Sequence, residues 1–172
     1  ELREQVGRLR GGLVQAGVQP GDRVAIVAAN NWYFVVSWLA ILGVGAVAVP
    51  INPASPGPEV TSELGDVGVV GVIVGPTGKR VLPDIDRAAV PDLRLIVQSD
   101  PGDLVVEGAV RLDELMTAEP TPIVPRDADD LAVLMFTSGT AGFPRAAKLS
   151  HGNRVSTALP RRTAWQWHGS LR

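Results

Sequence analysis

The 172-residue sequence contains no cysteine, which excludes disulfide bridges, thiol catalysis and thiolate metal sites. It has only two histidines, His151 and His168, too few for a histidine-based metal cluster. Its formal net charge is −2, which argues against a general nucleic-acid partner. The uncharged stretch 32–49 contains two glycines and ends before Pro50. It therefore predicts a helix followed by a buried strand rather than a membrane span.

Apolar residues make up 45% of the chain and the mean hydropathy is +0.17, as expected of a globular protein. A single domain of this length buries roughly 70% of its unfolded surface. The sequence enters an amphipathic pattern at Glu1 with no signal peptide, and with the lack of cysteine this predicts a cytoplasmic location. Because it does not begin with Met, we expect it to be a piece of a longer protein.

The segment 136–145 carries the strongest functional signal. The apolar run 131–136 predicts a buried strand, and a loop begins where this strand ends. Gly139 and Gly142 allow backbone N–H groups to approach a ligand, and hydroxyl groups and a fixed positive charge are added by Thr137, Ser138, Thr140 and Arg145. Such groups together suit the oxygens of a polyphosphate. The alternative, which composition alone favours, is a hairpin turn rich in Gly, Ser and Thr.

The string FTSGTAGFPRAAKLSHGN, residues 136–153, resembles the signature of the acyl-adenylate-forming (AMP-binding) enzymes, which include the acyl-CoA synthetases. The residues that match this signature in register are Phe136 to Thr140, Gly142, Pro144, Ser150, His151 and Asn153. The segments Gly17–Ala25 and Gly45–Pro53 are similar to the opening part of the same family. The resemblance covers residues 1 to about 153, and the pattern is most similar to that of fatty acyl-CoA synthetases.

The resemblance implies a two-step reaction in which a carboxylic acid, here preferably a fatty acid, reacts with ATP and then passes to the thiol of coenzyme A. It also implies that the β- and γ-phosphates of ATP, neutralised by Mg²⁺, are held by Thr137, Ser138, Gly139, Thr140, Gly142 and Arg145. The family's catalytic lysine, metal-binding acid and CoA site lie downstream, so no catalytic or metal-ligating residue is assigned. Lys148 is not that lysine.

We therefore expect the chain to be an N-terminal fragment of a fatty-acid–CoA ligase that is inactive by itself. Peripheral contact with a membrane is compatible with this expectation. Two alternatives remain open: a non-catalytic remnant, and an adenylate-forming ligase for another acid or acceptor. Three departures from the signature occur in the loop region. Ala141 removes a hydroxyl, Arg145 replaces a lysine, and Ala146 replaces a glycine.

Apolar β-branched runs alternate with helical patterns along residues 1–153. Strands are expected at 23–28, 46–49, 69–74, 93–97 and 131–136, and helices at 2–13, 31–42, 59–64 and 112–116. The proline- and acid-rich segment 119–130 predicts an exposed connector. This order predicts an α/β fold with a largely parallel sheet and flanking helices. Ligands in such folds bind at the carboxyl ends of strands, where the 137–145 loop would lie.

The last segment, 154–172, differs from the rest. It has four arginines and no acid, Pro160 would interrupt a helix begun near Asn153, and Trp165 and Trp167 alternate as in a strand. We therefore expect a partial N-terminal adenylate-forming domain at 1–153 and an atypical basic tail at 154–172. A shifted reading frame or a truncation would produce such a tail, and a divergent basic surface helix is the alternative. For His151 we expect a local structural contact rather than a general base.

Overall fold

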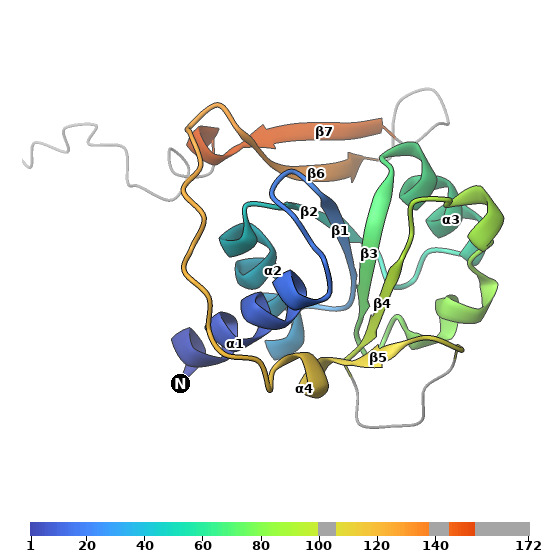
Figure 1. Cartoon of the computed structure of the whole chain (residues 1–172). Coiled ribbons are helices and arrows are strands. Elements are labelled where there is room, and N and C mark those ends of the chain that lie inside the picture. Colours follow the sequence, from blue (N-terminus) through green and yellow to red (C-terminus); the bar gives the residue numbers. More distant parts are fainter. Residues whose placement is uncertain (100–105, 138–144, 154–172) are drawn as a thin grey trace, which may run out of the picture.

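A computed structural model of the chain describes residues 1–99, 106–137 and 145–153 (Figure 1). Within these residues the strands form one seven-stranded sheet in the order β5-β4-β3-β1-β2-β6-β7. All neighbouring strands are parallel except β6 and β7, which form an antiparallel hairpin. The strands are β1 (Arg23–Val27), β2 (Val47–Ile51), β3 (Val69–Val74), β4 (Leu95–Gln98), β5 (Val110–Arg111), β6 (Leu131–Thr137) and β7 (Arg145–Ser150). The predicted fold class is confirmed.

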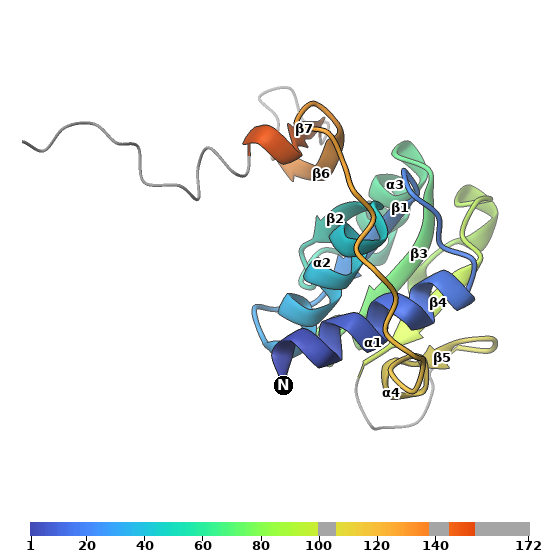
Figure 2. The same cartoon turned by 60° about the vertical axis from the view of Figure 1, so that its left-hand side comes forward.

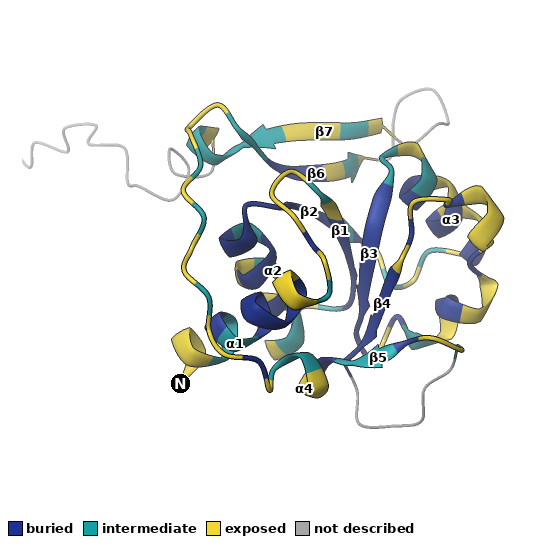
Figure 3. Ribbon diagram, viewed as in Figure 1, coloured by how far each residue is buried: buried dark blue, intermediate teal, exposed yellow. Residues whose placement is uncertain are grey.

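Helices cover both faces of the sheet, as Figures 1 and 2 show. They are α1 (Leu2–Gln15), α2 (Trp32–Val44), α3 (Gly57–Asp66), α4 (Leu112–Leu115) and the 3-10 helices η1 (Lys79–Asp84) and η2 (Arg87–Ala89). One apolar core joins the sheet to α1, α2 and α4, and a second core joins it to α3 and η1. Strand β3, which lies between β4 and β1, is buried along its whole length (Figure 3). Among the described residues, no helix is both long and apolar enough to cross a membrane.

The residues at the two ends of helix α2 explain where it begins and where it ends. The side chain of Asn31 accepts a hydrogen bond from the backbone N–H of Phe34 at 3.0 Å and so caps the first turn of the helix. The helix ends at Gly45, whose φ of +83° is a left-handed conformation that glycine adopts without strain. A residue with a Cβ atom would also meet the side chains of Arg126 and Val124 there. The uncharged stretch is thus a partly buried helix followed by a strand, as predicted.

Several elements differ from the sequence prediction: β7 was not among the expected strands, and β4 begins at Leu95 rather than at residue 93. Strand β2 does not stop at Val49 but runs through Pro50 to Ile51, because its partner β1 continues to Val27 beside it. The two-residue strand β5 was not predicted, since a pair of residues carries no periodicity. The predicted polar connection between β3 and β4 contains two 3-10 helices, η1 and η2.

The connector 119–130 is largely exposed, as predicted, but its backbone is anchored across α1 and α2. The guanidinium of Arg10, a side chain of 9% exposure, donates from both Nε and Nη2 to the carbonyl of Thr121. The N–H of Val124 donates to the carbonyl of Gly43 at 2.9 Å. Burial lowers the pKa of Arg10 from its ordinary value. These bonds fix the path by which the chain reaches β6.

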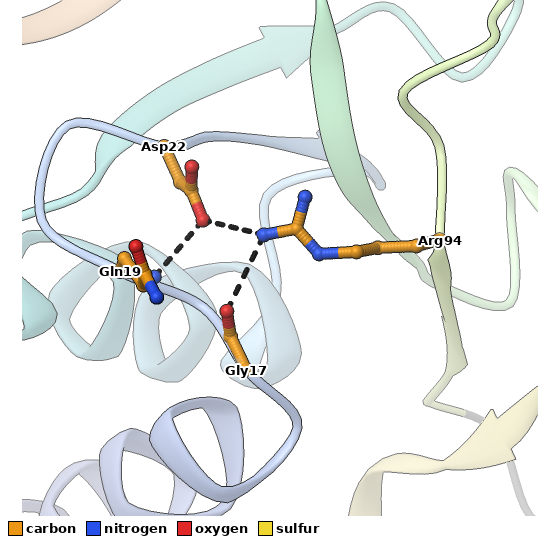
Figure 4. Close-up of polar contacts among 4 residues, drawn as sticks. All are labelled: Gly17, Gln19, Asp22 and Arg94. Carbon is orange, nitrogen blue, oxygen red and sulfur yellow. Dashed lines mark hydrogen bonds and ion pairs between the residues drawn. The ribbon is translucent and has the colours of Figure 1, made fainter.

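The turn between α1 and β1 is joined to the start of β4 by a polar cluster (Figure 4). Asp22 accepts a bond from the guanidinium of Arg94 at 2.8 Å and one from the N–H of Gln19 at 2.9 Å. The same Arg94 group donates to the carbonyl of Gly17 at 3.3 Å. Asp22 precedes β1, so the cluster lies at the amino ends of the strands, at the opposite edge from the 137–145 loop.

We expect the pair of Asp22 and Arg94 to contribute about 0.5–1 kcal/mol, because its guanidinium is half-exposed and screened by water. A double-mutant cycle with Asp22→Ala and Arg94→Ala, measured by urea unfolding, checks this value. Asp22→Ala should cost more than Arg94→Ala, since it also leaves the N–H of Gln19 without its acceptor. Equal costs for the two single variants would contradict that assignment.

Candidate functional site

The β6–β7 hairpin places two of the six predicted phosphate-binding residues opposite each other. Thr137 ends β6 and Arg145 begins β7, and the two are partners in the antiparallel ladder. The Thr137 hydroxyl donates to the carbonyl of Arg145 at 3.3 Å, which closes the base of the loop. Both residues are exposed. The other four predicted residues, Ser138, Gly139, Thr140 and Gly142, lie outside the described residues.

The far end of β7 is held by a local network. The side-chain oxygen of Asn153 accepts from the N–H of Ser150 at 3.0 Å and from its hydroxyl at 3.1 Å. The N–H of His151 donates to the carbonyl of Asp130, and that of Gly152 donates to the carbonyl of Ala128. These contacts tie the residues after β7 to those that precede β6. They agree with the local structural role predicted for this segment, and they set the register of the hairpin.

The hairpin leaves the sheet early. Strand β6 pairs with β2 at a single position, Ala48 with Val133, whereas its ladder with β7 continues to Thr137. Figure 2 shows the hairpin standing away from the remaining strands. A crevice of about 550 Å³ lies at the carboxyl ends of β1 and β2, and Met135 of β6 also lines it. Sequence analysis missed it, although a proline inside a strand was the available signal.

The carboxylates near the hairpin have structural roles. Asp130 forms an ion pair with Arg126 at 3.0 Å and accepts a bond from the N–H of Asp127. Beside α3 rather than beside the hairpin, Asp86 accepts from the N–H of Ala88 and caps η2. The described part of the chain contains no group of three or more acidic or histidine side chains that could hold a metal ion.

One titratable group is perturbed elsewhere. Glu63 of α3 has 6% exposure, and burial, with smaller contributions from Glu59 and Asp66, raises its pKa to about 7. It lies on a helix that packs against the sheet rather than in the loop or the crevice. Its perturbation is therefore a property of the packing of α3.

Comparison with known proteins decides the family. The family model described as "AMP-binding enzyme" matches residues 1–169. The chain belongs to this family. The match runs beyond Asn153 and across most of the basic segment. The segment 136–153, which resembles the family signature, lies within this match.

The chain is similar to two AMP-forming acid–CoA ligases with different acids. It is 33% identical to a methyl-dioxo-octahydroindenyl-propanoyl:CoA ligase of Mycobacterium tuberculosis, over 99% of this chain and 34% of that protein. It is 32% identical to the long-chain-fatty-acid–CoA ligase FadD15 of Mycobacterium bovis, over 90% of this chain and 26% of that protein. The chain thus spans between a quarter and about a third of the length of these relatives.

The solved structure of the anthranilate CoA ligase AuaEII in complex with anthranoyl-AMP superposes with a TM-score of 0.84. It shares 25% sequence identity, over 91% of this chain and 30% of that one. The parallel sheet with helices on both faces is therefore the fold of this part of the AMP-binding enzymes.

Proposed function

We propose that this chain supplies the phosphate-binding loop of an ATP-dependent acid–CoA ligase. In this proposal the β- and γ-phosphates of ATP are held by Thr137, Ser138, Gly139, Thr140, Gly142 and Arg145. Exposed Thr137 and Arg145 face each other across the base of the hairpin, at the carboxyl end of a strand that is parallel to its sheet neighbour. This arrangement is the observation that carries the proposal, because ligands of parallel sheets bind at this edge.

The chemistry of the described residues fits a phosphate chain better than a metal ion. The guanidinium of Arg145 is a fixed cation with several donors, which suits phosphate oxygens and cannot ligate a metal. Since the described residues contain no acidic cluster, we propose that Mg²⁺ enters with the nucleotide and has its protein ligands elsewhere. We assign no step of the reaction to a metal and no catalytic role to a residue of this chain.

For the substrate we propose a carboxylic acid, preferably a fatty acid, with coenzyme A as the acceptor. The fatty-acid preference rests on the overall sequence pattern and on the similarity to FadD15. The second candidate is a ligase for a cyclic or aromatic acid, which the similarity to the anthranilate ligase and to the indenyl-propanoyl ligase favours. The activity of a complete ligase that carries this segment, measured with hexadecanoate and with benzoate as the acid, separates the two candidate functions.

Replacing Arg145 by alanine is expected to weaken the binding of MgATP by about tenfold, since a hydrogen bond to a charged group contributes about 1.5–3 kcal/mol. Isothermal titration calorimetry of the 172-residue chain with MgATP and with tripolyphosphate measures this loss. Both ligands should be affected, because Arg145 is assigned to the phosphates.

Two further variants control this experiment. Arg145→Lys keeps the charge and should recover most of the affinity. Lys148→Ala removes an exposed cation from the same strand, three residues away, and should change little. If Lys148→Ala weakens both ligands as much as Arg145→Ala does, the contribution is a general charge effect and the assigned contact is wrong.

A further inference from the structure

We propose that a pocket between α1, α2 and the connector 119–130 binds an amphipathic carboxylate, a molecule with one anionic group and an apolar body. Arg10, a buried residue that lines the pocket, is the proposed partner of the carboxylate. This connector pocket has a volume of about 870 Å³, and no described residue of β6 or β7 lines it. The inference therefore does not rest on the phosphate role of the loop.

The walls of the connector pocket are mainly apolar. Three large side chains that line it are left in water, with exposures of 46% for Leu2, 40% for Leu39 and 67% for Ile123. Helix α2 carries no charged residue, and a helix that is apolar on all sides is typically covered on all sides. An apolar body that fills the pocket removes this surface from water, which favours binding. The apolar lining residues are Leu2, Val6, Leu39, Pro120, Pro122 and Ile123.

Arg10 brings a buried positive charge to these walls without a carboxylate to neutralise it. Its side chain has 9% exposure, and both Nε and Nη2 donate to one uncharged acceptor, the carbonyl of Thr121. In the part of the chain that the structure describes, no carboxylate forms an ion pair with Arg10. Buried charges in proteins are normally paired. An anion bound in the pocket would supply the missing partner.

The packing of Arg10 leaves one end of its guanidinium for a ligand. A Cβ atom at Gly43 of α2 would lie 2.9 Å from Cδ and 3.1 Å from Nη1 of Arg10, so the glycine makes room for this side chain. The bonds to Thr121 occupy the side formed by Nε and Nη2. Nη1 and the second N–H of Nη2 form the other fork, which matches the two oxygens of a carboxylate. Arg10 can thus hold the connector and a ligand together.

The remaining charges of the pocket favour an anion of single charge. Glu1, Arg3 and Glu4 also line it, and all three are exposed and screened by water. Glu4 is paired with Arg8 at 3.2 Å. Only Arg10 is a buried cation among the lining residues, and two exposed carboxylates oppose a more highly charged ligand. A monocarboxylate with an apolar chain satisfies both the guanidinium and the walls.

Three small molecules separate these two contributions. Decanoate has both the carboxylate and the apolar chain, decanol has the chain alone, and acetate has the carboxylate alone. Isothermal titration calorimetry of the 172-residue chain without nucleotide gives their dissociation constants. Decanoate should bind at least about tenfold more tightly than decanol, the scale of hydrogen bonds to a charged group. Acetate should bind far more weakly than either, because it buries almost no apolar surface.

Two variants test the assigned contacts. Arg10→Met keeps an apolar side chain of similar length and should abolish the preference for decanoate over decanol. Ile123→Glu places a carboxylate at an exposed lining position and should weaken decanoate by about fivefold, the effect of one unit charge at about 4 Å in water. Decanol should be affected clearly less. Val35→Glu is the matched control, because Val35 is an apolar residue of 45% exposure that does not line the pocket.

A signal from Arg10 itself reports the contact directly. In the ¹⁵N-labelled chain, the Nε–H resonance that disappears in Arg10→Met belongs to Arg10. Decanoate should shift this resonance, whereas decanol should shift it much less. If Arg10→Met fails to fold, the resonance is assigned through its contact with Thr121, and Ile123→Glu decides the outcome.

Equal affinities of the wild-type chain for decanoate and decanol would overturn the proposal. So would an Ile123→Glu chain that binds decanoate as the wild type does, or an equal loss in Val35→Glu. Phosphatidylglycerol vesicles form the last arm of the experiment. If the vesicles sediment the chain while decanoate leaves the Arg10 resonance unchanged, the exposed apolar residues contact a membrane and the pocket is not a carboxylate site.

Discussion

Replacing Gly12 by alanine should destabilise the chain by about 3 kcal/mol, although the same change in an exposed helix stabilises by about 1 kcal/mol. Gly12 lies inside α1, where a Cβ atom would meet the carbonyl oxygen of Leu115 at 2.2 Å and its carbonyl carbon at 2.7 Å. Both are backbone atoms at the end of α4, so a side-chain rotation cannot relieve the clash. The connector that leads to the signature hairpin starts from this contact.

Urea unfolding followed by circular dichroism measures the effect. Gly7→Ala is the matched control in the same helix, since its Cβ would meet the side chain of Pro120 at 3.1 Å and no backbone atom outside α1. We expect its midpoint to change far less. A Gly12→Ala variant as stable as the wild type would show that α4 does not pack on α1 as described.

Replacing Glu63 by glutamine should stabilise the chain by about 2 kcal/mol at pH 8 and have little effect near pH 4.5. The pKa of Glu63 is raised from 4.5 to about 7, mainly because burial disfavours the carboxylate. Its contribution to stability is thus fully present below pH 4.5 and is lost as the pH rises through 7. Glutamine does not ionise, so the variant avoids that loss.

Unfolding midpoints of both proteins at pH 4.5, 6 and 8 test this sign. Glu107→Gln is the control, because Glu107 is exposed and removal of its charge should change stability little at any pH. A benefit of Glu63→Gln that is constant across the three values would mean that the side chain is not a buried carboxyl that loses its proton in this range.

Much of the fold could be predicted because its signals are local. The β-branched run at 69–74 became β3 with the expected bounds, whereas α2 extends two residues beyond the predicted end at residue 42, to the left-handed Gly45. The length of β2 could not be predicted in this way. Pro50 ends a strand when judged locally, but pairing with β1 on the other edge keeps the backbone extended to Ile51.

For the candidate site, the signature alone picked out the loop and assigned its chemistry. Thr137 and Arg145 are eight residues apart, and the hairpin brings them into register as the loop proposal requires. Ser138, Gly139, Thr140 and Gly142 stay a prediction. The roles of Asp22 and of the Ser150–Asn153 network were not evident, because their partners are set by how distant or adjoining segments turn back on each other.

The sequence by itself determined the class of fold and the family, and it is the source of the proposal that residues 137–145 bind phosphate, since each depends on residue types at fixed spacing along the chain. Only the tertiary structure decided three other features. Strand β6 pairs with β2 at a single position, α4 packs closely against α1 at Gly12, and the side chain of Glu63 is buried. These three features depend on which backbone atoms of separate segments come within contact distance. The sequence pattern does not specify these contacts, because they form only when the sheet and its helices pack together.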